Sequence, residues 1–437
     1  MLIAGLMFPA LLLLITLGLP IAFSLAIVSA VAGWVAFGPF AVQQLYGAFY
    51  SAATNFILSA IPMFILMGAV LERCGIAERL YRVMNLWLGR LPGGLAVATI
   101  AMGAIFAAAA GVVGAVEVMI GMMAIPAMQR ARYSNSLIAG TICAGGSLGT
   151  MIPPSVIAVM YASLAQLSIG ELLAAMVLPG LAMVGLFILY IVIHGMVCPP
   201  EKGGETDPDL ALPLAEKLRL TITSLLPVMA LIVAVLGSLL AGIASPTEAA
   251  AVGAAGAMVL SIAYGRFSLP MLRESLRITV RISAMILLIV AAGTMFMGVF
   301  AANGGPKLVR AVVQGGGFGP TEMIIFFLLV VFVLGFILDW TANVLICVPL
   351  FTPFIRSAGI DPIWFATMVI IVIQAGYLTP PMASSIFYLK SIAPPGMTYG
   401  QMCRGVVPFI GLQLLTLVLL ALFPSLATWL PDKVVGF

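Results

Sequence analysis

The chain has 437 residues, of which 63% are apolar and 8% charged, and its mean hydropathy is +1.23. This composition excludes a water-soluble globular protein and predicts a polytopic helical membrane protein without a sizeable soluble domain. The formal charge of +4 says little alone, because orientation in a membrane depends on where Lys and Arg lie between spans.

About ten apolar runs approach the roughly 20 residues that a membrane span requires. The predicted spans cover residues 2–17, 20–36, 54–71, 136–163, 171–195, 221–242, 247–264, 280–300, 363–390 and 406–430, and two further runs, 93–127 and 319–354, are predicted as helical hairpins. With the first residue outside, 15 of the 19 Lys and Arg residues fall inside. We therefore expect both termini on the non-cytoplasmic side. One long helix over residues 2–36 would move only the N-terminus to the other side.

In each half, a segment between the third span and the hairpin is too polar to cross lipid. These segments cover residues 72–90 and 302–317. The first alternates apolar with basic residues, which predicts an amphipathic helix in the membrane interface. Such an arm either carries a mobile core against a fixed frame or serves as a surface connector.

Two of the predicted spans are interrupted by the same kind of break. The first runs from Gly146 to Ser155 (GSLGTMIPPS) and the second from Gly376 to Ser385 (GYLTPPMASS), with proline pairs 227 residues apart. Gly and paired Pro at membrane depth free backbone polar groups that only a cavity, an ion or a substrate can satisfy. Paired breaks in corresponding positions of two halves indicate the binding site of a transporter.

The repeat extends beyond the breaks. An offset of 227 also superposes Pro126 on Pro353, and an offset of 230 superposes Gly75 on Gly305. Each half has an odd number of spans, which predicts an inverted-topology repeat with two re-entrant hairpins and two discontinuous helices in an all-α membrane protein. The predicted divisions are a first repeat (1–198), a polar cytoplasmic linker (199–220) and a second repeat (221–437).

The two breaks, together with Ala244–Gly253 (ASPTEAAAVG) at the start of a later helix, carry a family resemblance. Over essentially its whole length the chain resembles the large membrane (M) subunit, DctM, of tripartite ATP-independent periplasmic (TRAP) transporters. The resemblance implies a multi-pass protein of a bacterial or archaeal cytoplasmic (inner) membrane. It further implies a sodium-driven importer of an organic acid, with a scaffold and an elevator-type transport domain.

The same resemblance implies the partners. These are a small four-helix membrane subunit and a periplasmic solute-binding protein, both separate chains, besides the lipid bilayer. Na⁺ is the expected coupling ion and the sole expected metal, with no other cofactor and no nucleic acid. The alternative is a self-sufficient sodium- or proton-coupled symporter of the divalent-anion type. An enzyme is not predicted, because the sequence lacks HExxH and a convincing acidic dyad.

Two sodium sites are expected where the hairpin tips, near residues 108–114 and 338–343, face the breaks. Unwound backbone carbonyls suit a hard cation, and hydroxyls can add to its shell. The first-half ligands are expected among Ala109, Gly111, Gly146, Ser147, Gly149 and Thr150. The second-half ligands are expected among Asp339, Thr341, Gly376, Thr379 and Ser384. The first tip is rich in Ala and Val where the family has serine, so its site would depend on carbonyls.

Substrate contacts are expected from Glu117, Trp340, Asn343, Pro154, Ser155 and Pro381. Glu117, Glu248 and Asp339 are carboxylates expected away from water, which marks each as a functional candidate. Asp339 could bind sodium, cap a helix or take part in proton coupling, whereas Glu248 follows Ser245 as in a capping box. Glu117 could contact the substrate, carry a proton or form an internal ion pair. Trp340 could stack on a substrate or wedge the tip.

Overall fold

The computed structural model describes residues 2–110, 113–198, 213–315, 318–381 and 383–434, and no β-strand occurs in those ranges. The helices of the first half are α1 (Leu2–Thr16), α2 (Ile21–Phe37), α3 (Phe40–Ala53), η1 (Phe56–Ser59), α4 (Ala60–Arg73), α5 (Ile76–Leu88), α6 (Gly94–Ala110), α7 (Val113–Arg130), α8 (Asn135–Ser147), η2 (Leu148–Thr150), α9 (Val156–Ala165) and α10 (Ile169–Val197). The helices of the second half are α11 (Leu214–Leu240), α12 (Pro246–Ala263), α13 (Leu269–Ala302), α14 (Gly305–Gly315), α15 (Pro320–Leu334), α16 (Trp340–Ser357), α17 (Pro362–Leu378), α18 (Ser384–Lys390), α19 (Tyr399–Leu422) and α20 (Ser425–Val434). Within these described ranges, six helices are long and apolar enough to cross a membrane, namely η1 with α4, α10, α11, α12, α13 and α19.

The hairpins and the helix breaks lie where the sequence predicts them. The first hairpin consists of α6 and α7, and the second consists of α15 and α16. The first discontinuous helix is interrupted after Thr150 and resumes at Val156, whereas the second is interrupted after Leu378 and resumes at Ser384. Proline has no N–H to continue a helix, which explains the position of both interruptions. The Pro-Pro peptide bond in each break is cis.

One helix was missed and three predicted boundaries were wrong. Helix α3 fills a stretch for which no element was predicted, because Gln43, Gln44 and Gly47 dilute its apolar character. The predicted span 406–430 is two helices, α19 and α20, separated at Pro424. Helix α13 starts eleven residues before the predicted 280–300 span, since its first turns carry Arg side chains. Helix α11 begins at Leu214, within the expected linker, and residues 199–212 lie outside the described ranges.

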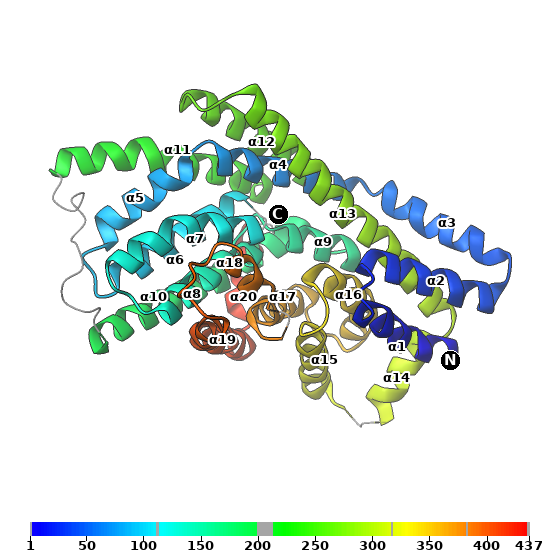
Figure 1. Cartoon of the computed structure of the whole chain (residues 1–437). Helices are drawn as coiled ribbons and strands as arrows, with labels where there is room; N and C mark the ends of the chain where they lie inside the picture. The colour runs from blue at the N-terminus through cyan, green and yellow to red at the C-terminus, as the bar shows by residue number, and fades with distance from the viewer. Residues whose placement is uncertain (1, 111–112, 199–212, 316–317, 382, 435–437) are drawn as a thin grey trace.

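The helices pack into two groups (Figure 1). We call α1–α5 and α11–α14 the frame helices, and α6–α10 and α15–α20 the core helices. Within the frame, α12 packs on α4, and α13 packs on α2, α3 and α4; within the core, α8 packs on α6, α7 and α19. The groups meet mainly where α4 and α5 contact α6 and where α13 contacts α16. The predicted polar segments 72–90 and 302–317 contain α5 and α14, respectively. The first of them, predicted as an amphipathic helix, is a helix that contacts α6 where the frame meets the core.

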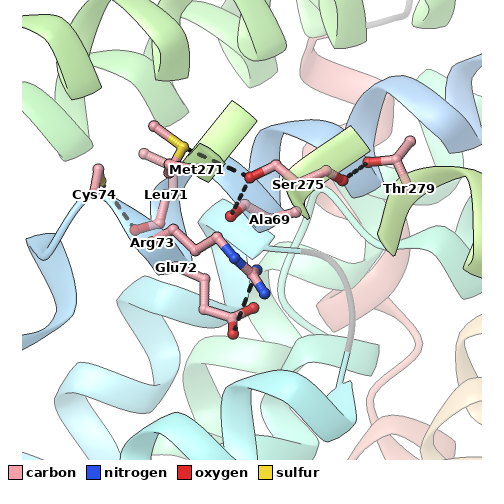
Figure 2. Close-up of polar contacts among 8 residues, drawn as sticks. All are labelled: Ala69, Leu71, Glu72, Arg73, Cys74, Met271, Ser275 and Thr279. Atoms are coloured by element: carbon pink, nitrogen blue, oxygen red, sulfur yellow. Dashed lines mark hydrogen bonds and ion pairs between the residues drawn. The ribbon is translucent and has the colours of Figure 1, made fainter. Parts of the chain in front are cut away.

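Polar contacts join the end of α4 to the start of α13 inside the frame (Figure 2). The Ser275 hydroxyl of α13 donates to the Ala69 carbonyl of α4 at 3.3 Å. The Cys74 thiol donates to the Leu71 carbonyl at 3.0 Å, and Arg73 lies 3.9 Å from the Glu72 carboxylate. The Leu71 carbonyl lies in the last turn of α4, where carbonyls lack intrahelical partners, so the Cys74 thiol satisfies one of these open groups.

Candidate functional site

Each hairpin packs against the discontinuous helix of its own half and against that of the other half. In the first half α6 and α7 contact α8, and in the second half α15 and α16 contact α17. The second arm of each hairpin also reaches across: α7 contacts α18, and α16 contacts α9. In Figure 1, α7 and α18 lie left of the centre of the molecule, and α9 and α16 lie right of it. The helix segment after each break, α9 or α18, is therefore held by a hairpin arm from the opposite half.

Arg356 forms hydrogen bonds across one of these contacts, between α16 and the end of α9. Its guanidinium, near the end of α16, donates from Nη2 to the carbonyl oxygens of Ala165 at 2.7 Å and Gln166 at 3.1 Å. Those carbonyls end α9, and Gln166 has a positive φ of 53°. A cation at a helix C-terminus satisfies open carbonyls and interacts favourably with the helix dipole. Arg356 thus fixes the far end of the first discontinuous helix to the second hairpin.

A small cavity lies at the second break, between the hairpin and α17. Its volume is about 10 Å³, and it is lined by Gly335, Leu338, Trp340, Asn343, Ile373, Gly376, Tyr377, Ala383 and Ser384. One water molecule requires about this much space. The backbones approach closely here, since a Cβ added to Gly376 would lie 3.4 Å from Cα of Gly335. The cavity therefore brings the hairpin tip, the broken helix and several predicted site residues together.

Two of the five expected second-half sodium ligands line this cavity. Gly376 and the half-buried Ser384 line it. Asp339 is the N-cap of α16, and its carboxylate accepts from the Thr341 backbone N–H at 3.2 Å, so helix capping is one role that the geometry supports. The Thr341 hydroxyl is buried and has no hydrogen-bond partner among the described residues. The Thr379 hydroxyl donates to the Ala375 carbonyl at 2.7 Å and keeps its lone pairs.

The expected first-half ligands are buried at the first break. Ala109, Gly146, Gly149 and Thr150 are all buried, whereas Gly111 lies outside the described residues. The Ser147 hydroxyl donates to the Ala144 carbonyl at 2.8 Å. It also accepts from Gln374 Nε2 at 3.2 Å and from Gln413 Nε2 at 3.3 Å. Both lone pairs of Ser147 are occupied, so a cation would have to displace an amide to use this oxygen.

Glu117 is fully buried in α7 and bonds to two side chains of the second half. Its Oε1 accepts from the Ser385 hydroxyl at 2.6 Å, and its Oε2 lies 3.4 Å from the Tyr377 hydroxyl. The side chain passes over Gly146, where an added Cβ would overlap Glu117 Cγ. Of the roles left open for Glu117, the internal ion pair was wrong within the described residues, because its partners are hydroxyls rather than basic groups.

The expected substrate residues do not converge on one pocket. Asn343 joins the hairpin arms, since its Nδ2 donates to the Val331 carbonyl at 2.8 Å. Ser155 donates to the Thr150 carbonyl at 2.8 Å and so bridges the first break beside the buried Pro154. Trp340 is half-buried at the cavity, whereas Pro381 is exposed. The structure therefore brings Trp340 and Asn343 together and leaves the other expected contacts apart.

Glu248 has a structural partner. Its carboxylate accepts from the Ser245 backbone N–H at 2.7 Å, and the Glu248 N–H donates to the Ser245 hydroxyl at 3.3 Å. This reciprocal pair is the capping box that the sequence suggested for the start of α12.

Four residues that build the site were missed in the sequence. They are Gln374, Tyr377, Ser385 and Gln413. A signal existed for the two glutamines, because an amide in the middle of an apolar helix needs an interhelical partner. The two hydroxyl residues had no local signal, since Tyr377 and Ser385 lie 260 and 268 residues from Glu117 along the chain.

Sequence comparisons with known proteins agree on one family. The sequence profile described as "Tripartite ATP-independent periplasmic transporter, DctM component" matches residues 8–426. The C4-dicarboxylate TRAP transporter large permease protein DctM of Pseudomonas aeruginosa is 30% identical over 399 residues, which cover 91% of each chain. The ectoine TRAP transporter large permease protein TeaC of Halomonas elongata is 30% identical over 425 residues, which cover 96% of each chain. Among solved structures, the YdaH transporter of Alcanivorax borkumensis has a similar fold, with a TM-score of 0.63 at 18% identity over 88% of each chain.

Proposed function

Because the chain belongs to the tripartite ATP-independent periplasmic transporter family, as its DctM component, we propose that it imports an organic acid together with sodium, driven by the sodium gradient. As a large permease subunit it is a multi-pass inner-membrane protein and not an enzyme. Members of this family work with a small membrane subunit and a periplasmic binding protein. Those two chains are its proposed partners, and the binding protein delivers the substrate.

The main support for the proposal is that the hairpin of each half contacts the broken helix of the other half. The pairs α7 with α18 and α16 with α9 are equivalent under the sequence repeat, as are the two helix breaks. Two antiparallel copies of one fold would produce such an exchange around a common axis, so the contacts support an inverted repeat. Sites at the interface of the repeats then face both breaks.

Sodium binding is proposed at the second break. The 10 Å³ cavity there suits one ion without its water shell. Oxygen ligands are at hand in the backbone around Gly376 and in the Ser384 hydroxyl, with the unpartnered Thr341 hydroxyl and Asp339 nearby. A hard cation prefers such oxygens. A first-half site would use carbonyls near Gly146 and Gly149, because the lone pairs of Ser147 are occupied.

An elevator movement is the proposed transport step. In this scheme the core helices move against the frame helices, and α5 at their junction carries the movement. The relatives compared above are named for C4-dicarboxylate and for ectoine, so membership of the family does not select one substrate. We propose a carboxylate, since helix N-termini at the breaks offer backbone N–H groups to an anion.

Reconstitution tests the function. The chain, its small subunit and the cognate binding protein should together accumulate the acid in liposomes only when sodium is present outside. Uptake of equal rate by this chain alone would favour the self-sufficient symporter. Ligand-induced stabilisation of the binding protein, measured over a panel of carboxylates, identifies the acid to use.

A pair of variants separates the two roles of Asp339. Asn is as good an N-cap as Asp but lacks its charge, whereas Ala lacks both. If Asp339 binds sodium, Asp339→Asn should require a higher sodium concentration for half-maximal uptake, and Asp339→Ala should lose sodium-dependent uptake. If Asp339 only caps α16, Asp339→Asn should match the unaltered protein in its sodium dependence.

A further inference from the structure

Two turns of the frame lie against each other at the ends of α4 and α12. Gly75, with a φ of 73°, joins α4 to α5, and Tyr264 ends α12. The guanidinium carbon of Arg79 in α5 lies 4.8 Å from the centre of the Tyr264 ring. In the opposite direction, a Cβ added to Gly75 would lie 3.7 Å from Nε of Arg266, which follows α12. Each turn therefore receives an arginine side chain from the other, and the two guanidinium groups lie over one contact.

Helix α11 adds a third arginine beside this contact. The Tyr264 hydroxyl donates to the Thr223 carbonyl of α11 at 2.7 Å. Arg219 lies one turn before Thr223, and its carbonyl accepts from the Thr223 hydroxyl at 2.8 Å. The Trp87 indole of α5 donates to the Thr221 hydroxyl of α11 at 2.9 Å, and α5 and α11 lie side by side at the upper left of Figure 1. Polar contacts thus join α5, α11 and α12 where the three arginines come together.

The three arginines, Arg79, Arg219 and Arg266, form what we call the basic cluster. All three are exposed, and none forms an ion pair within the described part of the chain. Glu78 and Glu216 are the acidic residues nearest to them in the sequence, and neither is paired with a member of the cluster there. Like charges that share one surface repel each other, so the folded chain leaves this surface ready for an anion.

Apolar side chains flank the basic cluster. Ile262, Phe267 and Leu269 lie within four residues of Arg266 and are all exposed. Exposed apolar side chains of a membrane protein face the acyl chains of the lipid. Trp87 is also exposed, and Trp is enriched where the hydrocarbon meets the lipid head groups. The cluster therefore lies at the depth of the lipid phosphates, on the side that the distribution of Lys and Arg assigns to the cytoplasm.

We propose that the basic cluster binds the head group of an anionic phospholipid from the membrane around the protein. Guanidinium groups pair with phosphate oxygens through two parallel hydrogen bonds. Basic pockets beside transmembrane helices take anionic lipid head groups in this way. A lipid fits better than a soluble phosphate compound, because the apolar side chains beside the cluster give its acyl chains a surface.

The position of the cluster gives the lipid a role in the proposed movement. Helix α5 contacts α11 on the frame side and α6 on the core side. A head group held between Arg79 and Arg266 would tie the start of α5 to the turn after α12, so the arm keeps a fixed end while the core moves. This role rests on the proposed transport function, whereas the binding of the lipid does not.

Thermal unfolding of the purified full chain in detergent tests the site without transport. Phosphatidylglycerol should raise the unfolding midpoint, whereas phosphatidylcholine and inorganic phosphate at the same concentration should not. Arg266→Gln should fold normally, because the Arg266 side chain makes no hydrogen bond within the described residues. Combined with Arg79→Gln, it should raise the phosphatidylglycerol concentration needed for the same effect about tenfold. The matched control is Arg277→Gln with Arg281→Gln, which removes the same charge from exposed positions of α13.

Three results of this measurement would overturn the site. They are equal stabilisation by phosphatidylglycerol and phosphatidylcholine, equal stabilisation by inorganic phosphate, and an unchanged lipid response in the Arg79 and Arg266 double variant. The complex with the small subunit should respond to phosphatidylglycerol as the single chain does. Loss of the response in the complex would assign the cluster to that subunit and overturn the lipid site as well.

Uptake in liposomes then tests the role of the lipid. Under a sodium gradient, the chain with its two partners should take up substrate several-fold faster when phosphatidylglycerol is added to phosphatidylcholine. The Arg79 and Arg266 double variant should lose that gain but keep sodium-driven uptake, and the control pair should keep both. Equal rates in the two lipid mixtures overturn the role at the arm. Absence of uptake in every mixture counts against the proposed function instead, and the unfolding measurement still decides the lipid site.

Discussion

Ser147 and Gln374 lie at equivalent positions of the two halves, 227 residues apart, and they hydrogen-bond to each other at 3.2 Å in the buried interior. A residue can meet its own symmetry copy only close to the axis that relates them. The contact therefore fits the proposed inverted repeat, whose pseudo-twofold axis would pass next to both helix breaks. Gln413 of α19 joins the same hydroxyl at 3.3 Å, so three helices of the core meet at one serine.

Ser147→Ala should destabilise the protein. The change leaves the amides of Gln374 and Gln413 without their shared acceptor, and an unsatisfied buried donor costs about 1–3 kcal/mol. Thr141→Val is the matched control on the same helix, because the Thr141 hydroxyl is buried without a partner and its loss should be neutral or stabilising. Thermal unfolding in detergent measures both variants. Equal midpoints for the two variants would show that Ser147 does not hold the helices together.

The sequence predicts the breaks and hairpins well because their chemistry is local. Paired Pro interrupts a helix because neither residue has an N–H to donate, so the breaks at residues 146–155 and 376–385 could be placed from the local sequence. The lengths of apolar runs placed most of the remaining helices. Helix α3 was missed because its two glutamines and Gly47 hide its apolar face.

The partners inside the site could not be predicted in the same way. Glu117 was selected for its charge, but its contacts with Tyr377 and Ser385 join segments that no local pattern connects. Ser384 was the expected ligand, but Ser385, the next residue, is the one that contacts Glu117. Successive residues of a helix point in directions about 100° apart. Only the packing of α7 against α18 decides which serine faces inward.

Gly146→Ala should be strongly disruptive, because the new methyl group would overlap the Glu117 side chain. Overpacking of a close-packed interior typically costs about 1–3 kcal/mol. The double variant Gly146→Ala with Glu117→Ala should regain part of the lost stability, since removal of Cγ clears the overlap. Thermal unfolding of the single and double variants measures this coupling.

Gly185→Ala in α10 is the control for that pair. No atom lies within 4 Å of a Cβ added at Gly185, so the substitution should be neutral or stabilise its helix by up to about 1 kcal/mol. If Gly146→Ala unfolds at the same temperature as Gly185→Ala, the contact between Gly146 and Glu117 is not as close as described.

Cys74 and Cys198 should react with a maleimide at different rates. Burial raises the pKa of the Cys74 thiol to about 11, whereas Cys198 is exposed at the end of α10. The thiolate is the reactive form, so a raised pKa lowers its fraction at neutral pH. Labelling of Cys74 should therefore be slow at neutral pH and should rise as the pH approaches 11. Mass spectrometry of the labelled peptides follows both sites, and equal rates in the folded protein would contradict the burial of Cys74.

Arg356→Ala should weaken the hold of the second hairpin on the first discontinuous helix. The variant loses two hydrogen bonds from a charged donor to the last carbonyls of α9, which are worth about 1.5–3 kcal/mol for each charged contact. Arg356→Lys should recover only part of the loss, because an ammonium group cannot reproduce the fixed fork of a guanidinium. Arg277→Ala serves as the control, since Arg277 is 68% exposed and its pair with Glu274 lies on the surface, where such pairs contribute roughly 0–1 kcal/mol. Unfolding midpoints and substrate uptake should both fall for Arg356→Ala and stay near the unaltered values for Arg277→Ala. If Arg356→Ala lowers neither, the far end of α9 is held by its apolar packing against α16 instead.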